Sequence, residues 1–299
     1  MATAKAKRGW LAHLWHEWTV ESWRPITSAF AKPRPNEWLD DQLTAAWLGH
    51  ATVLLNFFGI TLLTDPALLS RIGIPLPFTA IGPKRLTKPA LKIEELPAID
   101  LILLSHAHFD HIDWRTLRRF DGRTQVVTAP RTQDLLGWTR LRRITELRWG
   151  ERQEVTTVAG SLVVRAIPVN HWGARLQTDT YRGYNGYVLE RNGRRVIFAG
   201  DTALTNNFVK LRDARGYDLA IFGIGAYNPW IRSHCNPEQA IAMAHDAGAR
   251  FIMPVHHQTF KLSFEPFREP IERFVRAMAD EPERVALREI GETFVLPEG

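Results

Sequence analysis

Short apolar runs separated by turn residues dominate the chain from residue 43 onward. The runs at 45–57 and 60–64 are rich in β-forming residues and are separated by Phe58-Gly59, which predicts a hairpin. Similar runs predict further strands at 100–104, 125–128, 161–169, 184–190, 195–199, 218–223 and 251–255. Strands are therefore expected in both halves of the chain.

Two segments have helical patterns, at 237–247 and 270–279. The first has Asn236 as a candidate N-cap, Pro237 at the first helical position and Gly248 after its end. Strands in both halves with a few helices between them suit two packed β-sheets with helices outside.

The domain organisation follows from this pattern. With 299 residues, 45% hydrophobic and 23% charged, the chain has ordinary globular composition. We expect one domain at 41–299, preceded by a Trp-rich extension at 1–40 that ends in a breaker-rich stretch. The proline-rich segment 71–97 is expected to be a long loop over the body, and such loops are usually functional.

The expected cellular location follows from targeting and membrane signals that are not found in the sequence. No run reaches the ~18 consecutive apolar residues of a membrane span, and the basic N-terminus lacks the apolar core of a secretory signal. Cys235 is the only cysteine, so no internal disulfide can form. We expect a cytoplasmic protein, with peripheral membrane contact left open.

Arginine is concentrated between residues 115 and 152. The chain has a formal net charge of +6, and this window holds ten arginines, no lysine and four acids, so it accounts for the whole excess. We interpret it first as a solvated outer face of helices and loops. The alternative is a surface for anionic partners, either phospholipid headgroups or nucleic acid.

Four ligand-type residues crowd together directly after an apolar run: His106, His108, Asp110 and His111. In an extended segment the side chains of His106 and His108 point the same way, so both can bind one metal ion. Asp110 and His111 come after the chain turns and can bind a second ion nearby. Imidazole and carboxylate suit Zn²⁺ and other first-row divalent metals. A merely solvated polar loop is the weaker interpretation.

Further ligand-type side chains follow other predicted strands. His171, Asp201 and His256 each stand within two residues of a predicted strand end, and His257 comes next. Each alone is weak evidence, because a histidine or aspartate at a strand end is more often a turn residue. Their agreement with the loop at 106–111 predicts one metal site at one edge of the sheets.

The order His-x-His-x-Asp-His, a lone His, Gly-Asp-Thr and a strand-end His resembles the metallo-β-lactamase superfamily over about residues 43–265. The resemblance implies a four-layer αββα sandwich of α/β class, with two metal ions along one edge between the sheets. It implies that His106, His108 and His171 bind one ion, that Asp110, His111 and His256 bind the other, and that Asp201 bridges them.

The local context is most similar to the N-acylphosphatidylethanolamine-hydrolysing phospholipase D group. The matching segments are Trp47-Leu48-Gly49-His50-Ala51-Thr52, Leu63-Thr64-Asp65-Pro66, Gly82-Pro83-Lys84-Arg85, His171-Trp172, Ile224-Gly225-Ala226-Tyr227, and His234 leading into Pro237-Glu238-Gln239-Ala240. Sugar-lactone hydrolases of the superfamily share part of this pattern. His257 departs from it, because the phospholipase branch has Trp there; the register of Thr259-Phe260 still favours His256 as the ligand.

Ligand chemistry argues against some other branches of the superfamily and leaves others open. The cysteine lies outside every ligand position, which argues against β-lactamases of the common zinc class. Flavodiiron-type oxygen reductases have a carboxylate where His108 stands. Glyoxalase II and tRNA-processing nucleases share nearly the same ligand set, so the ligands alone leave them open.

The resemblance also implies catalytic roles. Two divalent ions about 3.5–4 Å apart can share a water and lower its pKa toward ~7, so Asp110 and Asp201 are expected to be catalytic. His234 resembles the active-site histidine of the family and is the candidate acid for the leaving group. The alternative is that His234 only orients the loop before Asn236.

Three residues near the motifs are expected to support the ligands or the substrate. His50 and Asp65 are expected beside the ligands, with Asp65 accepting a hydrogen bond from a ligand imidazole and fixing its tautomer. A satisfied core histidine is an equal alternative for His50. Tyr227, with Asn228 and Trp230, is expected to line the substrate cleft.

The sequence thus predicts a dinuclear metal-dependent hydrolase, first a phosphodiesterase of phospholipase D type acting on N-acylphosphatidylethanolamine-like lipids. The alternatives are a lactone or carboxyl-ester hydrolase with a small soluble substrate, which needs a compact polar pocket, and a non-catalytic binding module. The complete ligand set argues against the module. Two divalent metal ions are expected as cofactors, Zn²⁺ first, with Mn²⁺ or Fe²⁺ compatible.

Partners are indicated mainly by the N-terminus. Residues 8–23 hold four of the eleven tryptophans. A helix there has one apolar stripe, made by Trp10, Leu11, Leu14, Trp15 and Trp18. We favour packing of this helix on the domain or on a partner subunit, which leaves a homodimer open. The alternative is an interfacial helix on an anionic membrane. Nucleic acid is the least favoured partner.

Overall fold

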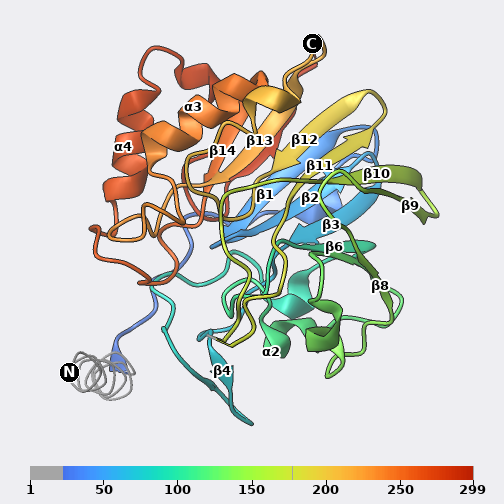
Figure 1. Ribbon diagram of the computed structural model, residues 1–299, viewed down its shortest axis with the longest axis vertical. Coiled ribbons are helices and arrows are strands. Elements are labelled where there is room, and N and C mark those ends of the chain that lie inside the picture. Colours follow the sequence, from blue (N-terminus) through green and yellow to red (C-terminus); the bar gives the residue numbers. More distant parts are fainter. Residues whose placement is uncertain (1–22, 177, 299) are drawn as a thin grey trace.

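Two β-sheets lie face to face in the computed structural model, which describes residues 23–176 and 178–298 (Figure 1). The first sheet has seven strands in the order β15-β1-β2-β3-β6-β7-β8, and the second has six in the order β14-β13-β12-β11-β10-β9. A separate two-stranded ribbon pairs β4 with β5.

The strand bounds, in chain order, are β1 (Leu43–Gly49), β2 (Thr52–Phe57), β3 (Ile60–Thr64), β4 (Ile74–Pro75), β5 (Ala80–Ile81), β6 (Leu101–Leu104), β7 (Gln125–Thr128), β8 (Arg143–Glu146), β9 (Arg152–Thr157), β10 (Gly160–Ile167), β11 (Gly186–Arg191), β12 (Arg194–Phe198), β13 (Tyr217–Gly223), β14 (Ala249–Val255) and β15 (Thr293–Val295). The described α-helices are α2 (Trp114–Leu117), α3 (Pro237–Ala247) and α4 (Glu269–Ala277). Short 3₁₀ turns are Pro35–Glu37, Ile93–Glu95, Gln133–Leu136, Val209–Leu211 and Pro282–Arg284.

Two hydrophobic cores hold the layers together. The main core lies between the sheets, where Leu54 of the first sheet and Tyr187 of the second belong to one buried cluster. A second core joins Phe222 on the outer face of β13 to Met243 of α3 and Phe274 of α4. Burial of such apolar surface is the main force that stabilises the fold. The αββα sandwich expected from the sequence is confirmed.

Parallel pairing brings several strand ends to one edge of the sandwich. In the first sheet β3, β6, β7 and β8 are parallel neighbours, and in the second sheet β12, β13 and β14 are parallel neighbours. Carboxyl ends of parallel strands meet at the same edge of a sheet. The segments that follow β3, β6, β12 and β14 therefore carry the candidate site.

Most predicted strands are present, with ends shifted by no more than two residues. The single run 45–57 is the exception and was predicted wrongly, because it forms two antiparallel strands, β1 and β2. The reversal occurs at Gly49 and His50, which have φ angles of +112° and +55°. Both strands are fully buried, so the apolar run continues through the turn and conceals it.

Five strands were not predicted: β4, β5, β8, β9 and β15. β4 and β5 are two-residue strands inside the segment 71–97, which was expected to be a long loop. β8 lies inside the arginine-rich window that we interpreted as helices and loops, so that interpretation is corrected there. β8 and β9 are at sheet edges, and most of their side chains are exposed or half-buried. Edge strands of this kind have no apolar run from which a strand can be predicted.

The helix predictions agree closely with the structure. α3 has the predicted bounds, the Gln239 backbone N–H donates to Asn236 Oδ1 at 2.9 Å, and Gly248 ends the helix at φ +78°. α4 begins at Glu269 and ends at Ala277, one and two residues before the predicted ends. In the described part of the chain, no helix has the length and hydropathy needed to cross a membrane.

Residues 23–40 run along the body of the domain. Thr27 forms a β-bridge with Thr87, and the Ala31 N–H donates to the Ile290 carbonyl at 3.2 Å. The predicted amphipathic helix at 8–23 falls outside the described residues except for its last residue. The division at residue 40 remains a prediction.

Candidate metal centre

The site is built from segments that follow four strands. Asp65 follows β3, the loop 105–112 follows β6, Asp201 follows β12 and His256 follows β14. The Gly200 that precedes Asp201 has φ +59°, and a Cβ there would lie 2.7 Å from Ser105 Cβ. The close packing of these two turns therefore requires glycine and brings both sheets to the site.

The first group of candidate ligands contains His106, His108 and His171. Nε2 of His106 lies 2.8 Å from Nδ1 of His108, and Nε2 of His171 lies 3.4 Å from the same atom. The opposite nitrogen of His171, Nδ1, is 2.7 Å from the Ser233 carbonyl and donates to it. This contact fixes the tautomer that leaves Nε2 free to bind a metal.

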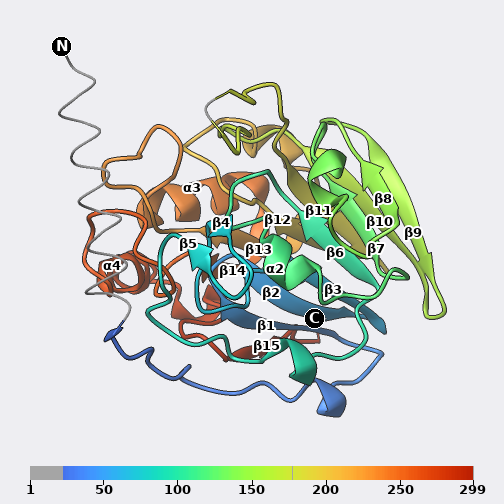
Figure 2. The same cartoon turned by 90° about the horizontal axis from the view of Figure 1, so that it is seen from below.

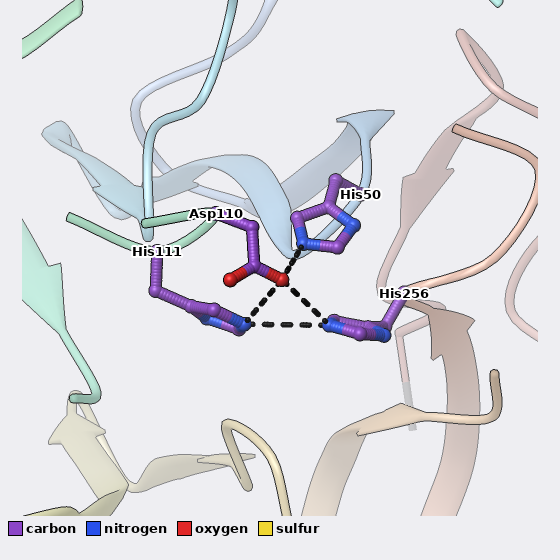
Figure 3. Close-up of side chains that lie close together, drawn as sticks. All are labelled: His50, Asp110, His111 and His256. Carbon is purple, nitrogen blue, oxygen red and sulfur yellow. Dashed lines mark hydrogen bonds and ion pairs between the residues drawn. The ribbon is translucent and has the colours of Figure 1, made fainter. Parts of the chain in front are cut away.

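The second ligand group contains His50, Asp110, His111 and His256, shown in Figure 3. Asp110 Oδ2 lies between the rings, 3.0 Å from His50 Nε2 and 3.6 Å from Nε2 of both His111 and His256. His111 Nδ1 is 2.6 Å from Asp65 Oδ2. Asp65 thus makes the contact with a ligand imidazole that the sequence predicted, and His50 contacts a ligand carboxylate.

Asp201 lies between the two groups. Its Oδ2 is 3.1 Å from His111 Nε2 and 3.2 Å from His256 Nε2. The same oxygen is 4.0 Å from Nε2 of both His106 and His171. One carboxylate oxygen therefore faces imidazoles of both groups, as a bridging ligand would.

The donor set fits bound metal. Asp201 Oδ2 is buried and accepts no well-oriented hydrogen bond in the described structure, although imidazole nitrogens surround it. A buried polar atom without a partner is costly, and a cation at this point would satisfy it. Histidine and carboxylate ligands suit zinc and similar divalent ions. The His/Asp cluster is therefore compatible with a metal site.

Electrostatic coupling is strong around the buried Asp201 and the half-buried Asp110. Burial opposes ionisation of Asp201, but the imidazoles of His111 and His256 hold the pKa of its carboxyl well below the usual range. The pKa of Asp110 is held low in the same way. Burial lowers the pKa of His111 and His256, yet the facing carboxylates raise the first well above its usual value and the second to about 9. Both imidazoles must therefore lose a proton to bind metal.

The first group has the opposite protonation. Burial lowers the pKa of His106 and His171 well below the usual value. It also lowers the pKa of His108 to about 4 and, in the second group, that of His50 to about 3. These imidazoles are neutral at pH 7, which is the form that binds a metal ion.

The predicted acid His234 and the predicted substrate residue Tyr227 have different positions. His234 lines a cavity of about 220 Å³ over the cluster, together with Trp230, and its Nδ1 is 3.7 Å from Asp201 Oδ2. Tyr227 does not line that cavity among the described residues. Its hydroxyl donates instead to Glu269 Oε1 at 2.8 Å, on the start of α4. The structure therefore does not bring Tyr227 to the metal cluster.

Three residues with clear contacts were not predicted. Ser105 Oγ is 2.5 Å from Asp65 Oδ2 and 2.8 Å from His106 Nδ1, so it links an aspartate to a ligand. Trp172 packs edge-on against the His108 ring at 4.6 Å. Arg175 Nη1 donates to the Ala107 and Ile112 carbonyls of the ligand loop. Ser105 was signalled by its position between a buried strand and His106, whereas nothing local marks Arg175.

The cavity over the cluster continues into a second one of about 390 Å³. The two share His108, Asp110, Trp172 and Leu262. Beyond them the second cavity is lined by apolar side chains, including Ile72, Ile74, Ile81, Pro83 and Phe109. The metal cluster therefore lies at the polar end of a space that is otherwise mostly apolar.

Comparisons with known proteins agree with this geometry. Residues 61–257 match a family model described as a beta-lactamase superfamily domain. The chain is 34% identical over 268 residues to an uncharacterised protein of Mycobacterium tuberculosis, covering 85% of this chain and 68% of that protein. It is 32% identical over 252 residues to the N-acyl-phosphatidylethanolamine-hydrolyzing phospholipase D 1 of Caenorhabditis elegans, covering 79% of this chain and 70% of that protein.

A solved structure agrees at the level of the fold. A metallo hydrolase of the archaeon Ignicoccus hospitalis aligns with a TM-score of 0.65 at 20% identity, covering 86% of this chain and 100% of that chain. This likeness concerns the arrangement of strands and helices alone.

Proposed function

Because the chain belongs to the metallo-β-lactamase superfamily of metal-dependent hydrolases, we propose that it is a dinuclear phosphodiesterase of phospholipase D type. Its proposed substrates are N-acylphosphatidylethanolamine-like lipids. The Caenorhabditis elegans relative supports this choice, because its name states that activity.

One observation carries the proposal: the cavity over the metal cluster opens into an apolar cavity. Asp110 and His108 line both spaces, so a substrate at the cluster has apolar walls directly beside it. A phosphodiester between a headgroup and a diacylglycerol fits this arrangement, with the phosphate at the polar end. A small lactone leaves the 390 Å³ apolar cavity unused.

In this proposal the side chains have the following roles. His106, His108 and His171 would hold one ion, and Asp110, His111 and His256 would hold the other, with Asp201 as the ligand shared by both groups. When bound, the two ions supply Lewis-acid stabilisation of the phosphoryl oxygens and a water activated near neutral pH. His50 holds the carboxylate of Asp110 in place, and Asp65 does the same for the His111 ring. His234 gives a proton to the leaving alcohol as the headgroup-side P–O bond breaks.

The test measures both metal content and products. We expect about two divalent ions per chain, most of them zinc, and release of N-acylethanolamine and phosphatidic acid from N-acylphosphatidylethanolamine in mixed micelles. Asp201→Ala should reduce turnover by roughly 100-fold or more and lower the metal content. The matched control is Asp246→Ala, which changes an exposed carboxylate on α3.

The outcomes separate the proposal from its alternative. Hydrolysis of lactones or carboxyl esters without cleavage of the phosphodiester would establish the small-substrate hydrolase instead. Full activity in a chelated, metal-free sample would contradict any metal-dependent mechanism for this site.

A further inference from the structure

A short hairpin beside the metal site has an unusually apolar tip. It joins β4 to β5, and its side chains Ile74, Leu76 and Phe78 are 49%, 36% and 94% exposed. Figure 1 shows the hairpin projecting below the body of the molecule, and Figure 2 shows β4, β5 and α2 close together. Exposed apolar groups at a projecting tip are costly in water and mark an interaction site.

The base of this hairpin is firmly held. Gly73 has φ +119°, and a Cβ there would lie 2.1 Å from the Ile81 carbonyl oxygen. Gly82 approaches the other strand as closely, with a Cβ position 2.4 Å from the Ile72 oxygen. The buried Arg71 donates through Nη1 to the Gly82 carbonyl at 2.8 Å. The apolar tip is thus presented by a fixed base.

A cationic groove runs along one side of the hairpin. It has a volume of about 490 Å³, and its walls include Leu76 together with Arg115, Arg118, Arg119 and Trp138. No acidic side chain lines this groove among the described residues. Arg119 pairs with Glu94 at 3.6 Å, but both side chains are more than half exposed, so the pair is weak. The groove therefore combines apolar walls with three positive charges.

One hydrogen bond joins the groove to the hairpin. Arg115 Nη2 donates to the Phe78 carbonyl at 3.1 Å, which joins the helix α2 to the hairpin tip. The side chain of Trp138 is 78% exposed, so a second large apolar group stands at the rim of the same groove.

We propose that this hairpin–arginine surface, made of Ile74, Leu76, Phe78, Arg115, Arg118, Arg119 and Trp138, docks the protein on an anionic phospholipid bilayer. The tip enters the boundary between headgroups and acyl chains. The arginines bind the phosphates of anionic headgroups, for which a guanidinium is well suited. Charge complementarity and the adjoining apolar tip together favour a lipid surface over any purely polar polyanion.

The surface also lies beside the route to the metals. The other side of the hairpin contributes Ile74 and Ile81 to the 390 Å³ cavity that reaches His108 and Asp110. A lipid drawn from the bilayer along the hairpin thus meets apolar walls until its phosphate reaches the ligands. This last step rests on the proposed function, whereas docking itself requires no turnover.

Vesicle co-sedimentation of the full chain tests the docking. The protein should sediment with vesicles of phosphatidylcholine and phosphatidylglycerol, and far less with phosphatidylcholine alone. Arg118→Gln/Arg119→Gln should weaken binding about fivefold per arginine removed, and Leu76→Ser/Phe78→Ser about tenfold.

Matched controls are available on the far hairpin between β9 and β10. Val158 is a fully exposed apolar residue at its tip, and Arg152 is an exposed arginine at its start. Val158→Ser and Arg152→Gln should bind vesicles like the unchanged protein. Equal loss in these controls would show a non-specific charge or hydrophobicity effect and would overturn the proposal.

Insertion of the tip can be measured directly, because the only native cysteine is buried. Phe78→Cys carrying an environment-sensitive fluorophore should shift to the blue on addition of anionic vesicles, and labelled Val158→Cys should not. Tip and arginine variants that sediment like the unchanged protein would refute the docking surface. If the tip variants instead abolish self-association of this chain and leave vesicle binding intact, the surface pairs two copies and the proposal fails. Neither measurement depends on hydrolysis. A failure of the docking proposal is therefore distinguishable from a failure of the proposed activity.

Discussion

His234 lies at the candidate metal centre, in the segment before α3. It faces the cavity over the cluster, and its Nδ1 lies 3.7 Å from Asp201 Oδ2. It is in neither of the two main ligand groups, but with His171 and Asp201 it forms a further group that could hold a metal ion. Burial lowers its pKa, so in the unliganded site the imidazole is mostly neutral at pH 7. A proton-donating role therefore requires the negative charge that develops on the leaving group.

This leads to a test at the scale of one residue. His234→Asn should lower turnover of substrates with poor leaving groups by roughly 100-fold or more, and that of p-nitrophenyl phosphodiesters much less. Metal content should stay unchanged. His245→Asn, on the half-exposed end of α3, is the control. Equal losses for good and poor leaving groups would favour the alternative, in which His234 orients the loop before Asn236.

Whether a residue's place in the candidate site could be predicted depends on where in the sequence the residues that it contacts lie. His106, His108 and Asp110 stand in one short motif, so their proximity follows from chain connectivity. Asp201 and His256 could be placed because they follow apolar strands that end at one edge. Tyr227 follows such a strand too, but the chain after β13 turns its side chain toward α4, and no local pattern indicates that turn.

The ligand loop between β6 and α2 depends on a distant side chain. Arg175 Nη1 donates to the Ala107 carbonyl at 2.8 Å and to the Ile112 carbonyl at 3.0 Å, which spans the loop. Its guanidinium also lies over the rings of Phe109 and Trp114, 3.9 and 4.4 Å from their centroids. We therefore expect Arg175 to help position the candidate ligands on this loop.

Replacement by lysine tests that role, because lysine keeps the charge and loses the planar fork. Arg175→Lys should weaken metal binding by about tenfold and lower the free energy of unfolding by about 2 kcal/mol. Chelator competition and denaturant unfolding of the metal-free protein measure the two effects, with Arg152→Lys as the control. Lower stability with unchanged metal affinity would make Arg175 a packing residue only.

Secondary-structure elements were predictable where burial imposes a pattern. α3 was predicted to the residue because its cap, first-turn proline and terminal glycine are all local signals. β8 and β9 were missed because edge strands are held by backbone pairing with one neighbour, which leaves no trace in side-chain polarity. The turn between β1 and β2 was missed for another reason: its residues Gly49 and His50 are buried inside an otherwise apolar run, so they do not stand out as a surface turn.

At the scale of the whole molecule, the sandwich was predictable, whereas the distribution of the arginines over the surface was not. Apolar runs in both halves of the chain predict two sheets, and the segments between the runs do not change that prediction. The arginine-rich window was read as one solvated face, but its members end in different places: Arg115 contacts the β4–β5 hairpin, whereas Arg152 stands at the far edge strand β9. Only the folded arrangement shows which arginines share a surface with exposed apolar groups.

The last prediction concerns residues 1–22, which precede the described part of the chain. They carry three tryptophans and three basic residues, Lys5, Lys7 and Arg8. If they form an interfacial helix, they add to the hairpin–arginine surface, since tryptophan and basic side chains both favour the membrane boundary. A chain starting at Trp23 should then bind anionic vesicles about tenfold more weakly than the full chain.

The starting point of that shorter chain matters, because Thr27 pairs with Thr87 and Ala31 donates to the Ile290 carbonyl. A chain starting at Lys32 loses both contacts and confounds membrane binding with instability, whereas a start at Trp23 keeps them. Co-sedimentation with anionic vesicles and thermal unfolding are measured side by side. Equal vesicle binding by the two chains would place residues 1–22 against the domain or a partner subunit, and a change in sedimentation velocity on truncation would then identify the partner subunit.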